Sequence, residues 1–358
     1  MRRLKALGLS TLLAGTVAGA FAASGTRGQA ATAHARLHKS ASVLLYIDGA
    51  LGDLGFFDSA NAGVQRAQKE LGATVKVIQN NDNTQWQGQL LRLAGTHKYD
   101  LIIVTASDAN MNNATAALIK RYPQQRVIDF DDNTFASKPG VSTIIYRQNE
   151  GSFLAGALAA MVANDTKLPY VSHKNIIGMV GGQKEQVILD FRDGYAQGAR
   201  AVSPQIQVRE TYIGGSGGND TWDNAPQGAR LARSLYNDGA SVVYQVAGGS
   251  GLGVLSQAKT SNRYAIGVDS NQDAQAPGHV IGSVVKRVDN SLYDLINLYQ
   301  KGQLKGGQIY YYGLRNNGVG LTRDTYTQAI ITPAMYKKLD ALAAQVASGK
   351  IKVKSEFK

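Results

Sequence analysis

From Ser42 onward, short apolar runs alternate with longer segments in which apolar residues recur every three or four positions. The first series predicts strands at 42–47, 74–78, 99–105 and 126–130 and helices at 59–72, 84–97 and 109–123. The second series predicts strands at 175–181, 206–214, 241–247 and 264–269 and helices at 186–202, 225–240 and 253–261. Short, continuously apolar strands are typical of parallel sheets covered on both faces, so the pattern predicts two doubly wound α/β lobes.

The segments between and after these series predict that the chain crosses between the lobes several times. The segment at 142–165 predicts a strand that runs into a long helix. The later segments predict a strand at 280–288, a helix at 288–302, a strand at 307–314 and a helix at 332–350. We therefore expect residues 41–146 plus 282–314 in an N-terminal lobe and residues 147–281 plus 315–358 in a C-terminal lobe. Several crossings make a hinge, and the cleft of a hinged protein closes over a ligand. In open parallel sheets, ligands bind beyond the carboxyl ends of the strands.

The N-terminus has the pattern of a secretory signal. Three basic residues, Arg2, Arg3 and Lys5, precede an apolar stretch and an A-x-A cleavage site at residues 20–22. We expect a signal peptide at residues 1–22 and a flexible leader at residues 23–40, rich in small and basic residues. The twin arginine leaves the choice between the Sec and Tat export routes open.

Composition narrows the possible classes of protein. The chain contains no cysteine, which excludes disulfides, zinc–thiolate sites and thiol nucleophiles. Because bacterial lipoproteins carry their lipid on a cysteine, the sequence predicts a periplasmic protein that is not membrane-anchored. The formal net charge is +12, but the basic residues are scattered along the chain, so we expect no nucleic-acid partner.

A glycine-rich loop interrupts the apolar run Tyr244–Leu255, with the sequence YQVAGGSGLGVL. A dinucleotide fingerprint needs G-x-G-x-x-G, and here Val254 stands where the last glycine belongs. A P-loop needs a lysine after its last glycine, and none follows Gly253. We interpret the segment as a strand, a turn and a helix start, in which Gly248 lets backbone approach a ligand closely.

Carboxylates and aromatic residues follow the first predicted strand. Asp48 ends it, and the loop GALGDLGFFDSANAG then brings Asp53, Phe56, Phe57 and Asp58. One phenylalanine is a candidate platform for a flat ligand while the other packs inward, because adjacent side chains point in different directions. The alternative for Asp58, shared with Ser59, is a helix cap.

The later predicted strands carry further candidates. Asp108 follows the strand at 99–105, where it either faces the ligand or caps the next helix. Trp222 lies in a loop of small residues and faces the cleft or packs on its own lobe. Asp269 and Lys286 end two strands, and they either bind sugar hydroxyls or form a salt bridge between the lobes.

Five segments, in this order, resemble the basic membrane protein family of ABC-transporter substrate-binding proteins, which are similar to purine nucleoside receptors. They are GDLGFFDSANAG, YRQNEGSFLAGALAA, IIGMVGG, VVYQVAGGSGLGV and GHVIGSVVKRVD. The resemblance runs from about Val43 to beyond Leu321. It implies a type I periplasmic-binding fold that hands a nucleoside to a membrane permease.

The resemblance also implies roles for individual residues. Phe56 matches the phenylalanine that stacks on the base, Asp48 matches the aspartate that binds the base edge, and Trp222 falls where the family often has an aromatic residue. The positions that hold the ribose match Gly248, Asp269 and Lys286. Two departures lie beside the base site, namely the insertion GGSGGNDT before Trp222 and Phe57 in place of an asparagine, so the base preference is left open.

We therefore expect a monomeric, non-catalytic nucleoside receptor without a cofactor or metal. One alternative keeps the fold but binds a sugar or another small metabolite, for uptake or for sensing. The other is a nucleoside or glycoside hydrolase that uses paired carboxylates among Asp48, Asp53, Asp58 and Asp269.

Overall fold

The computed structural model describes residues 40–106, 108–214 and 221–357. The predicted signal peptide at residues 1–22 lies outside the described residues, as does the predicted leader at 23–40 apart from Ser40. Within these described ranges, no helix is both long and apolar enough to cross a membrane.

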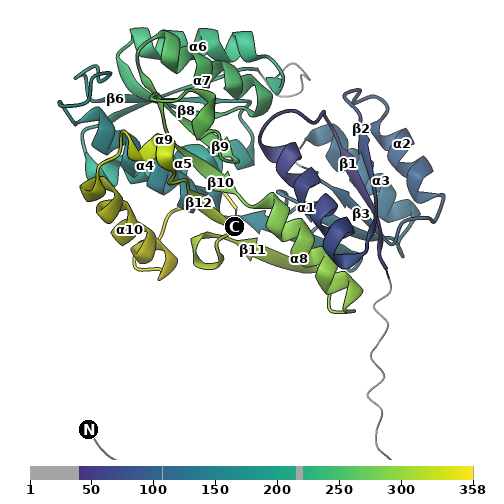
Figure 1. The fold of residues 1–358 in the computed structure, drawn as a ribbon. Helices are drawn as coiled ribbons and strands as arrows, with labels where there is room; N and C mark the ends of the chain where they lie inside the picture. The colour runs from purple at the N-terminus through teal and green to yellow at the C-terminus, as the bar shows by residue number, and fades with distance from the viewer. Residues whose placement is uncertain (1–39, 107, 215–220, 358) are drawn as a thin grey trace, which may run out of the picture. The chain divides into compact units, whose positions relative to one another are not determined.

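Two six-stranded sheets form the framework (Figure 1). The first contains β1 Ser42–Ile47, β2 Thr74–Gln79, β3 Leu101–Val104, β4 Arg126–Phe130, β5 Val141–Tyr146 and β11 Gln308–Tyr312. The second contains β6 Ile176–Gly181, β7 Gln207–Tyr212, β8 Ala240–Val246, β9 Tyr264–Asp269, β10 Val280–Lys286 and β12 Val319–Leu321. Their orders are β11-β5-β4-β3-β1-β2 and β12-β10-β9-β8-β6-β7. All neighbours pair in parallel except β12, which runs antiparallel to β10.

Helices cover both faces of each sheet, and we call each sheet with its helices a lobe. In the first lobe they are α1 Phe56–Leu71, α2 Trp86–Ala94, α3 Ala109–Arg121 and α8 Val288–Gln300. In the second lobe they are α4 Gln148–Ala163, α5 Gln186–Val202, α6 Ala225–Asn237, α7 Gly251–Thr260, the short α9 Thr325–Gln328 and α10 Pro333–Ala347. The connections contain short 3-10 turns, among them η2 Gly248–Ser250, η3 Asp273–Gln275 and η4 Leu314–Asn316.

The sequence of β1 is apolar because helices cover both faces of its sheet. Val43 and Leu45 pack with α1 and α8 on one face of the sheet, whereas Leu44 and Tyr46 pack with α2 and α3 on the other. Because successive strand residues point to opposite faces, a strand buried on both sides needs apolar residues at every position.

The helices α4 and α5 pack with their backbones in contact. A β-carbon placed on Gly156 would lie 1.9 Å from the carbonyl oxygen of Tyr195, and one on Gly198 would lie 1.8 Å from that of Phe153. Only glycine fits at such a crossing, so these positions fix the helix pair.

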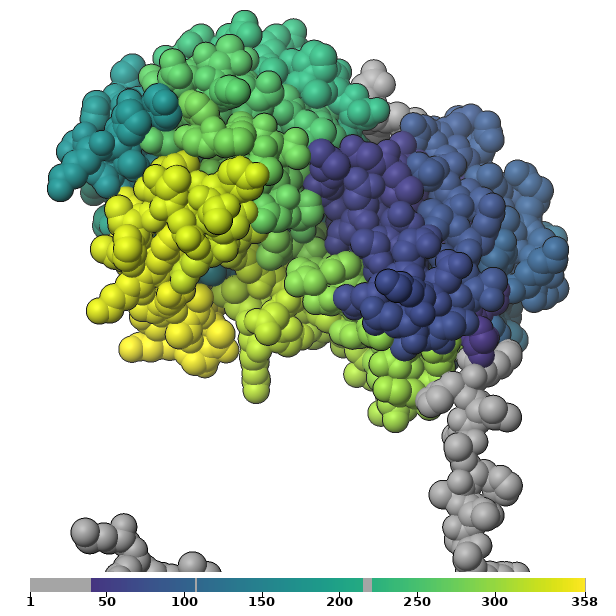
Figure 2. Space-filling model, in the orientation of Figure 1, coloured from purple at the N-terminus to yellow at the C-terminus, as the bar shows by residue number. Residues whose placement is uncertain are grey.

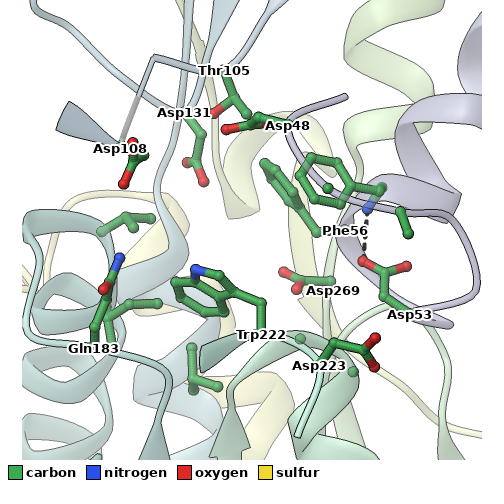
Figure 3. Close-up of a pocket in the computed structure, with 18 of the residues that line it drawn as sticks. Asp48, Asp53, Phe56, Thr105, Asp108, Asp131, Gln183, Trp222, Asp223 and Asp269 are labelled. Carbon is green, nitrogen blue, oxygen red and sulfur yellow. Dashed lines mark hydrogen bonds between the residues drawn. The ribbon is translucent and has the colours of Figure 1, made fainter. Parts of the chain in front are cut away.

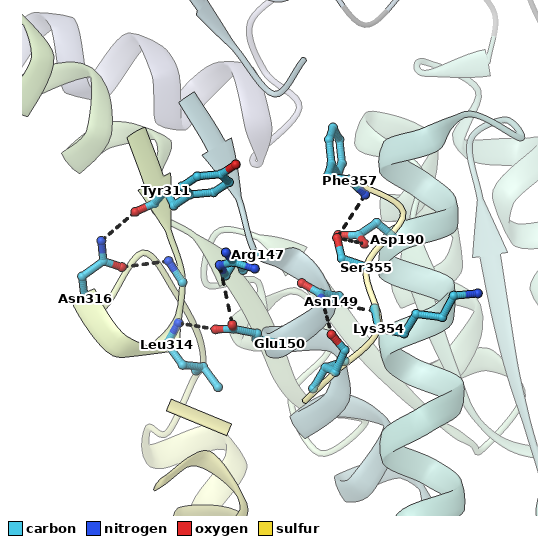
Figure 4. Close-up of polar contacts among 12 residues, drawn as sticks. Arg147, Asn149, Glu150, Asp190, Tyr311, Leu314, Asn316, Lys354, Ser355 and Phe357 are labelled. Carbon is cyan, nitrogen blue, oxygen red and sulfur yellow. Dashed lines mark hydrogen bonds and ion pairs between the residues drawn. The ribbon is translucent and has the colours of Figure 1, made fainter. Parts of the chain in front are cut away.

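In the described part of the chain, three connections join the two sheets, at residue 147, at residue 287 and at residues 313–318. Glu150 links two of them, since it accepts the backbone N–H of Leu314 at 2.9 Å and lies 3.9 Å from Arg147 (Figure 4). The strand β10 belongs to the second sheet, so residues 282–286 do not lie in the N-terminal lobe as expected. The chain returns to the first lobe only at α8.

The last residues of the chain lie along α4 and α5. Asn149 Nδ2 donates to the carbonyl oxygens of Val353 and Lys354 at 3.1 and 3.2 Å (Figure 4). Asp190 accepts the Ser355 hydroxyl and the Glu356 N–H, both at 2.8 Å. The buried side chains of Asn149 and Asp190 therefore hold this segment against the two helices.

Candidate functional site

A cavity of about 530 Å³ lies where the carboxyl ends of strands from both sheets meet (Figure 3). In the first sheet, the chain passes from β1 to β2 on one side and then continues with β3 on the other side, so the direction of the connections reverses between β1 and β3. In the second sheet, the same reversal occurs between β6 and β8. Such switch points are where doubly wound sheets bind ligands, because the loops after the two strands diverge there. Residues after β1, β3, β6 and β8 all line this cavity.

The loop between β1 and α1 is shaped by two aspartates. Asp53 accepts the backbone N–H groups of Gly55, Phe57 and Asp58 at 2.9, 2.9 and 3.1 Å. Asp58 accepts those of Gly52 and Leu54, both at 2.9 Å. These bonds satisfy amides at the start of α1, which therefore begins at Phe56 and not at 59 as predicted. Asp53 lines the cavity, whereas Asp58 does not and instead supports the loop.

Both phenylalanines after Gly55 line the cavity. The ring of Phe56 stacks on Phe130, with centroids 5.3 Å apart and an interplanar angle of 29°. The ring of Phe57 lies 5.4 Å from that of Phe56 and covers Gly49. The expectation that one of the pair would pack away from the ligand site is therefore wrong, because Gly49 leaves room for the second ring.

Asp48 lies directly after β1 and lines the cavity. Its Oδ1 has no hydrogen-bond partner among the described residues. Burial, together with the charge of the nearby Asp108, raises the pKa of Asp48 to about 7. Asp108 itself accepts the N–H groups of Asn110 and Met111, so it caps α3 while also lining the cavity.

Trp222 enters the cavity from the second lobe (Figure 3). Its indole lies against the backbone at Gly182, where a β-carbon would come within 2.2 Å of the ring. Ser250 holds the tryptophan segment, since its N–H donates to the Trp222 carbonyl at 3.1 Å and its hydroxyl donates to that of Thr221 at 2.8 Å. The tryptophan thus both packs on its own lobe and faces the cavity.

The glycine-rich loop also reaches the cavity. Gly248 has φ +55°, the left-handed region that favours glycine, and a β-carbon there would lie 3.4 Å from the Trp222 carbonyl. Gly248 and Gly249 both line the cavity.

Lys286 and Asp269 lie at the ends of β10 and β9, and both line the cavity. Lys286 is 1 % exposed and forms an ion pair with Asp131. Its Nζ also lies 4.9 Å from the ring centroid of Phe56, 5.0 Å from Tyr146 and 5.2 Å from Phe191. The salt bridge between lobes therefore exists, but the carboxylate is Asp131 and not Asp269.

The ionisation of the Asp269 carboxyl group depends strongly on its burial. Burial raises its pKa to about 7, although Lys286 opposes this rise. Its φ of +65° is unusual for a residue other than glycine. Asp131 shares this feature with φ +71°, so two carboxylates in rare backbone conformations flank the same lysine.

Besides Asn81 and Asp223, sequence reasoning missed four polar residues that line the cavity, namely Thr105, Asp131, Gln183 and Glu185. Each follows β3, β4 or β6, so the rule that ligands gather at strand ends would have found them. Burial raises the pKa of Glu185 to about 8 and also raises that of Asp131. Thr105 Oγ1 and Asp131 Oδ1 lack hydrogen-bond partners among the described residues.

The site combines aromatic surfaces with hydrogen-bonding groups. Phe56 and Phe57 come from one lobe and Trp222 from the other, while carboxyl groups line the walls. Among the described residues, no group of His, Cys, Asp and Glu has the arrangement of a metal site. Such a cavity suits a flat, partly apolar molecule that carries several hydrogen-bond donors.

Curated relatives resemble the chain over most of its length. The nucleoside-binding protein BmpA of an ABC transporter in Lactococcus lactis is 31% identical over 69% of this chain and 69% of its own. Basic membrane protein D of Borreliella burgdorferi is 28% identical over 87% of each chain. An uncharacterized lipoprotein of Pyrococcus horikoshii is 30% identical over 79% of this chain and 69% of its own.

Solved structures share the fold. A solute-binding protein of an ABC transporter system from Aeropyrum pernix K1 superposes with a TM-score of 0.77 at 24% identity, over 87% of this chain and 92% of that one. Its counterpart from Conexibacter woesei has a TM-score of 0.68 at 21% identity, over 89% and 100%. The predicted type I periplasmic-binding fold, with two doubly wound lobes, is confirmed.

The relatives contradict the prediction of a free periplasmic protein. Two archaeal relatives are named lipoproteins and others basic membrane proteins, names that indicate attachment to a membrane. The prediction depended on the missing cysteine, and the lack of one residue type does not exclude attachment by another route. We withdraw it.

The family model for PnrA-like ABC transporter substrate-binding proteins matches residues 40–356, which is nearly all of the described chain. The members of this family are substrate-binding proteins, and the two solved structures named above are solute-binding proteins. The resemblance seen in the sequence motifs is thus confirmed, and the chain belongs to the PnrA-like family of ABC transporter substrate-binding proteins.

Proposed function

We propose that this protein captures a purine nucleoside in the cavity between its lobes and delivers it to the membrane permease of an ABC transporter. The observation that carries the proposal is the meeting of Phe56 and Trp222, from opposite lobes, in one cavity with buried carboxyl groups. Stacking of a base on an aromatic ring contributes about 1–3 kcal/mol. The name of the Lactococcus lactis relative, a nucleoside-binding protein, supports the same ligand class.

In this proposal the base lies between Phe56 and Trp222. Asp48 binds the base edge, where its unpartnered Oδ1 accepts a hydrogen bond from a ring or amino N–H. Asp269 accepts from the ribose hydroxyls, Lys286 donates to them, and Gly248 leaves space for the sugar. Each of these six residues lines the cavity, which supports their joint use.

We propose that binding involves no bond cleavage. Of the four carboxyl groups that the hydrolase alternative would use, Asp53 and Asp58 already accept backbone amides of the β1–α1 loop, which leaves only Asp48 and Asp269. Incubation with inosine should therefore release no free hypoxanthine beyond the buffer blank. Release that saturates with inosine and disappears in Asp48→Asn would favour the hydrolase instead.

A thermal-shift panel tests the ligand class. The protein, refolded to remove any bound ligand, is heated with guanosine, inosine, adenosine, cytidine, free bases, glucose and arabinose. A ligand present at a hundred times its Kd adds about 2.7 kcal/mol to the free energy of unfolding. We expect the purine nucleosides to raise Tm and the sugars to leave it unchanged. A rise in Tm with sugars alone would indicate that the cavity binds sugars and not nucleosides.

A further inference from the structure

Two buried glutamines connect the glycine-rich loop of the second lobe to the phenylalanine-bearing loop of the first. Gln245 in β8 is 0 % exposed, and Gln272, between β9 and β10, is 1 % exposed. Gln245 Nε2 donates to Gln272 Oε1 at 2.7 Å, and Gln245 Oε1 accepts the N–H of Ala247, next to Gly248, at 3.1 Å. Burying an amide is unfavourable unless it is hydrogen-bonded, so these bonds hold both side chains in place.

Gln272 extends this connection to the other lobe. Its Oε1 also accepts the N–H of Val268 at 3.0 Å, while its Nε2 donates to the carbonyl oxygen of Leu54 at 3.1 Å. The hydroxyl of Ser270 donates to the same oxygen. Two donors of the second lobe therefore hold one oxygen of the first. In Figure 2 the purple start of the first lobe meets the green part of the second lobe.

Leu54 has little else to hold it in place. Its φ is +47°, which is strained for a leucine, and the residue is 43 % exposed. Its N–H donates to Asp58 within the loop, whereas its carbonyl oxygen accepts from the second lobe. The same loop carries Asp53 and leads into Phe56, both of which line the cavity.

We propose that Gln272, which Gln245 holds in place, and Ser270 form a latch on the Leu54 carbonyl, and that this latch sets how long a ligand stays in the cavity. When the bonds to Leu54 break, the β1–α1 loop separates from the second lobe and the cavity opens at that edge. Gln272 is then a positioning residue, since it acts through Leu54 and does not line the cavity. The inference rests on the proposed function only in requiring that a small molecule binds in this cavity.

Hydrogen exchange and ligand release test the latch with the full chain. Ser270→Ala removes one donor to Leu54, and Gln272→Met removes the other with little change in volume. Asn271→Ala is the matched control, because Asn271 lies between them but bonds to Asp324 in its own lobe. Exchange of amides in residues 49–57 is measured without ligand, and dissociation of inosine is followed by stopped-flow tryptophan fluorescence.

We expect Ser270→Ala and Gln272→Met each to speed exchange in residues 49–57 and inosine release by about twofold to tenfold, the effect of one net hydrogen bond. Asn271→Ala should behave as wild type. Faster exchange confined to the second lobe would show that Gln272 only supports its own lobe and would overturn the proposal. So would exchange in all three variants equal to wild type.

Two further outcomes are decisive. If Gln272→Met does not fold, Ser270→Ala decides alone, because its hydroxyl bond lies at the exposed surface. If inosine does not bind wild type, the nucleoside proposal fails, and the exchange rates still decide the latch.

Discussion

Lys286 and Asp131 form a buried ion pair that joins the end of β10 in one lobe to the end of β4 in the other. The two residues are 1 % and 5 % exposed. Three aromatic rings surround the ammonium group of Lys286. One oxygen of the Asp131 carboxylate lacks a partner among the described residues, so both charged groups are poorly hydrated. This pair fixes the floor of the cavity beneath Phe56.

Removal of the lysine should destabilise the protein strongly. Lys286→Met leaves the Asp131 carboxylate buried without its partner, which typically costs about 3–5 kcal/mol of the free energy of unfolding. Urea denaturation measures the change. The double variant Lys286→Met with Asp131→Asn removes both charges and should recover much of the loss. A double variant no more stable than the single one would show that the pair contributes by packing alone.

We expect the flat ring of Trp222 to contribute to inosine affinity by stacking on the base. We expect Trp222→Ala to weaken inosine binding by about 1–3 kcal/mol through lost stacking. Trp222→Phe keeps an aromatic face and should lose less, which makes it the matched control. Isothermal titration gives both affinities. Equal losses in the two variants would mean that the base does not stack on this ring.

The position of the indole depends on Gly182. A methyl group there would lie within 2.2 Å of the ring, so Gly182→Ala should displace Trp222 into the cavity and weaken binding at least tenfold. Gly88→Ala in α2 is the control, since only a flexible Arg92 side chain lies near, at 3.3 Å. It should bind normally and be slightly more stable, because alanine favours helix. Unchanged binding in Gly182→Ala would contradict the proposed role of the indole.

The buried acids predict a pH dependence of stability. The pKa values of Asp48 and Asp269 are raised to about 7 and that of Glu185 to about 8, against about 4 in an unfolded chain. The folded state therefore holds more protons, and the contribution of these acids is complete below pH 4 and is lost as pH rises through 7 to 8.

Melting of the ligand-free protein at pH 6 and pH 8.5 checks this sign. The Tm of wild type should fall between these values more than that of Asp48→Asn, which cannot ionise there. If Tm falls by the same amount in both proteins between pH 6 and pH 8.5, the pKa of Asp48 is not raised in the folded state.

The fold was predictable because its signals are local. The strand at 42–47 was predicted with the bounds that β1 has, since apolar residues at every position require two covered faces. The start of α1 was placed three residues late, because the pattern does not show that Asp53 accepts three amides of the next turn. The crossing at β10 was misplaced since a buried strand reads the same in either sheet.

The site was predictable only in part. Asp48, Phe56 and Trp222 are conspicuous in sequence, and the structure brings all three to one cavity. Asp131 was missed, because it follows β4 without a glycine-rich loop to mark it. Its pairing with Lys286 joins residues 155 positions apart, which no local pattern reveals. The roles in ligand binding are still a prediction that the titrations above decide.

The backbone contact between α4 and α5 has a consequence for sequence drift. Gly156 and Gly198 lie outside the cavity lining, yet no larger residue fits at either without forcing the two helices apart. A saturation mutagenesis screen scored for ligand uptake should therefore find two separate islands of intolerance, one around the cavity and one along this helix pair. Substitutions in the cavity lining can alter which ligand binds, whereas those along the helix pair can only damage the fold.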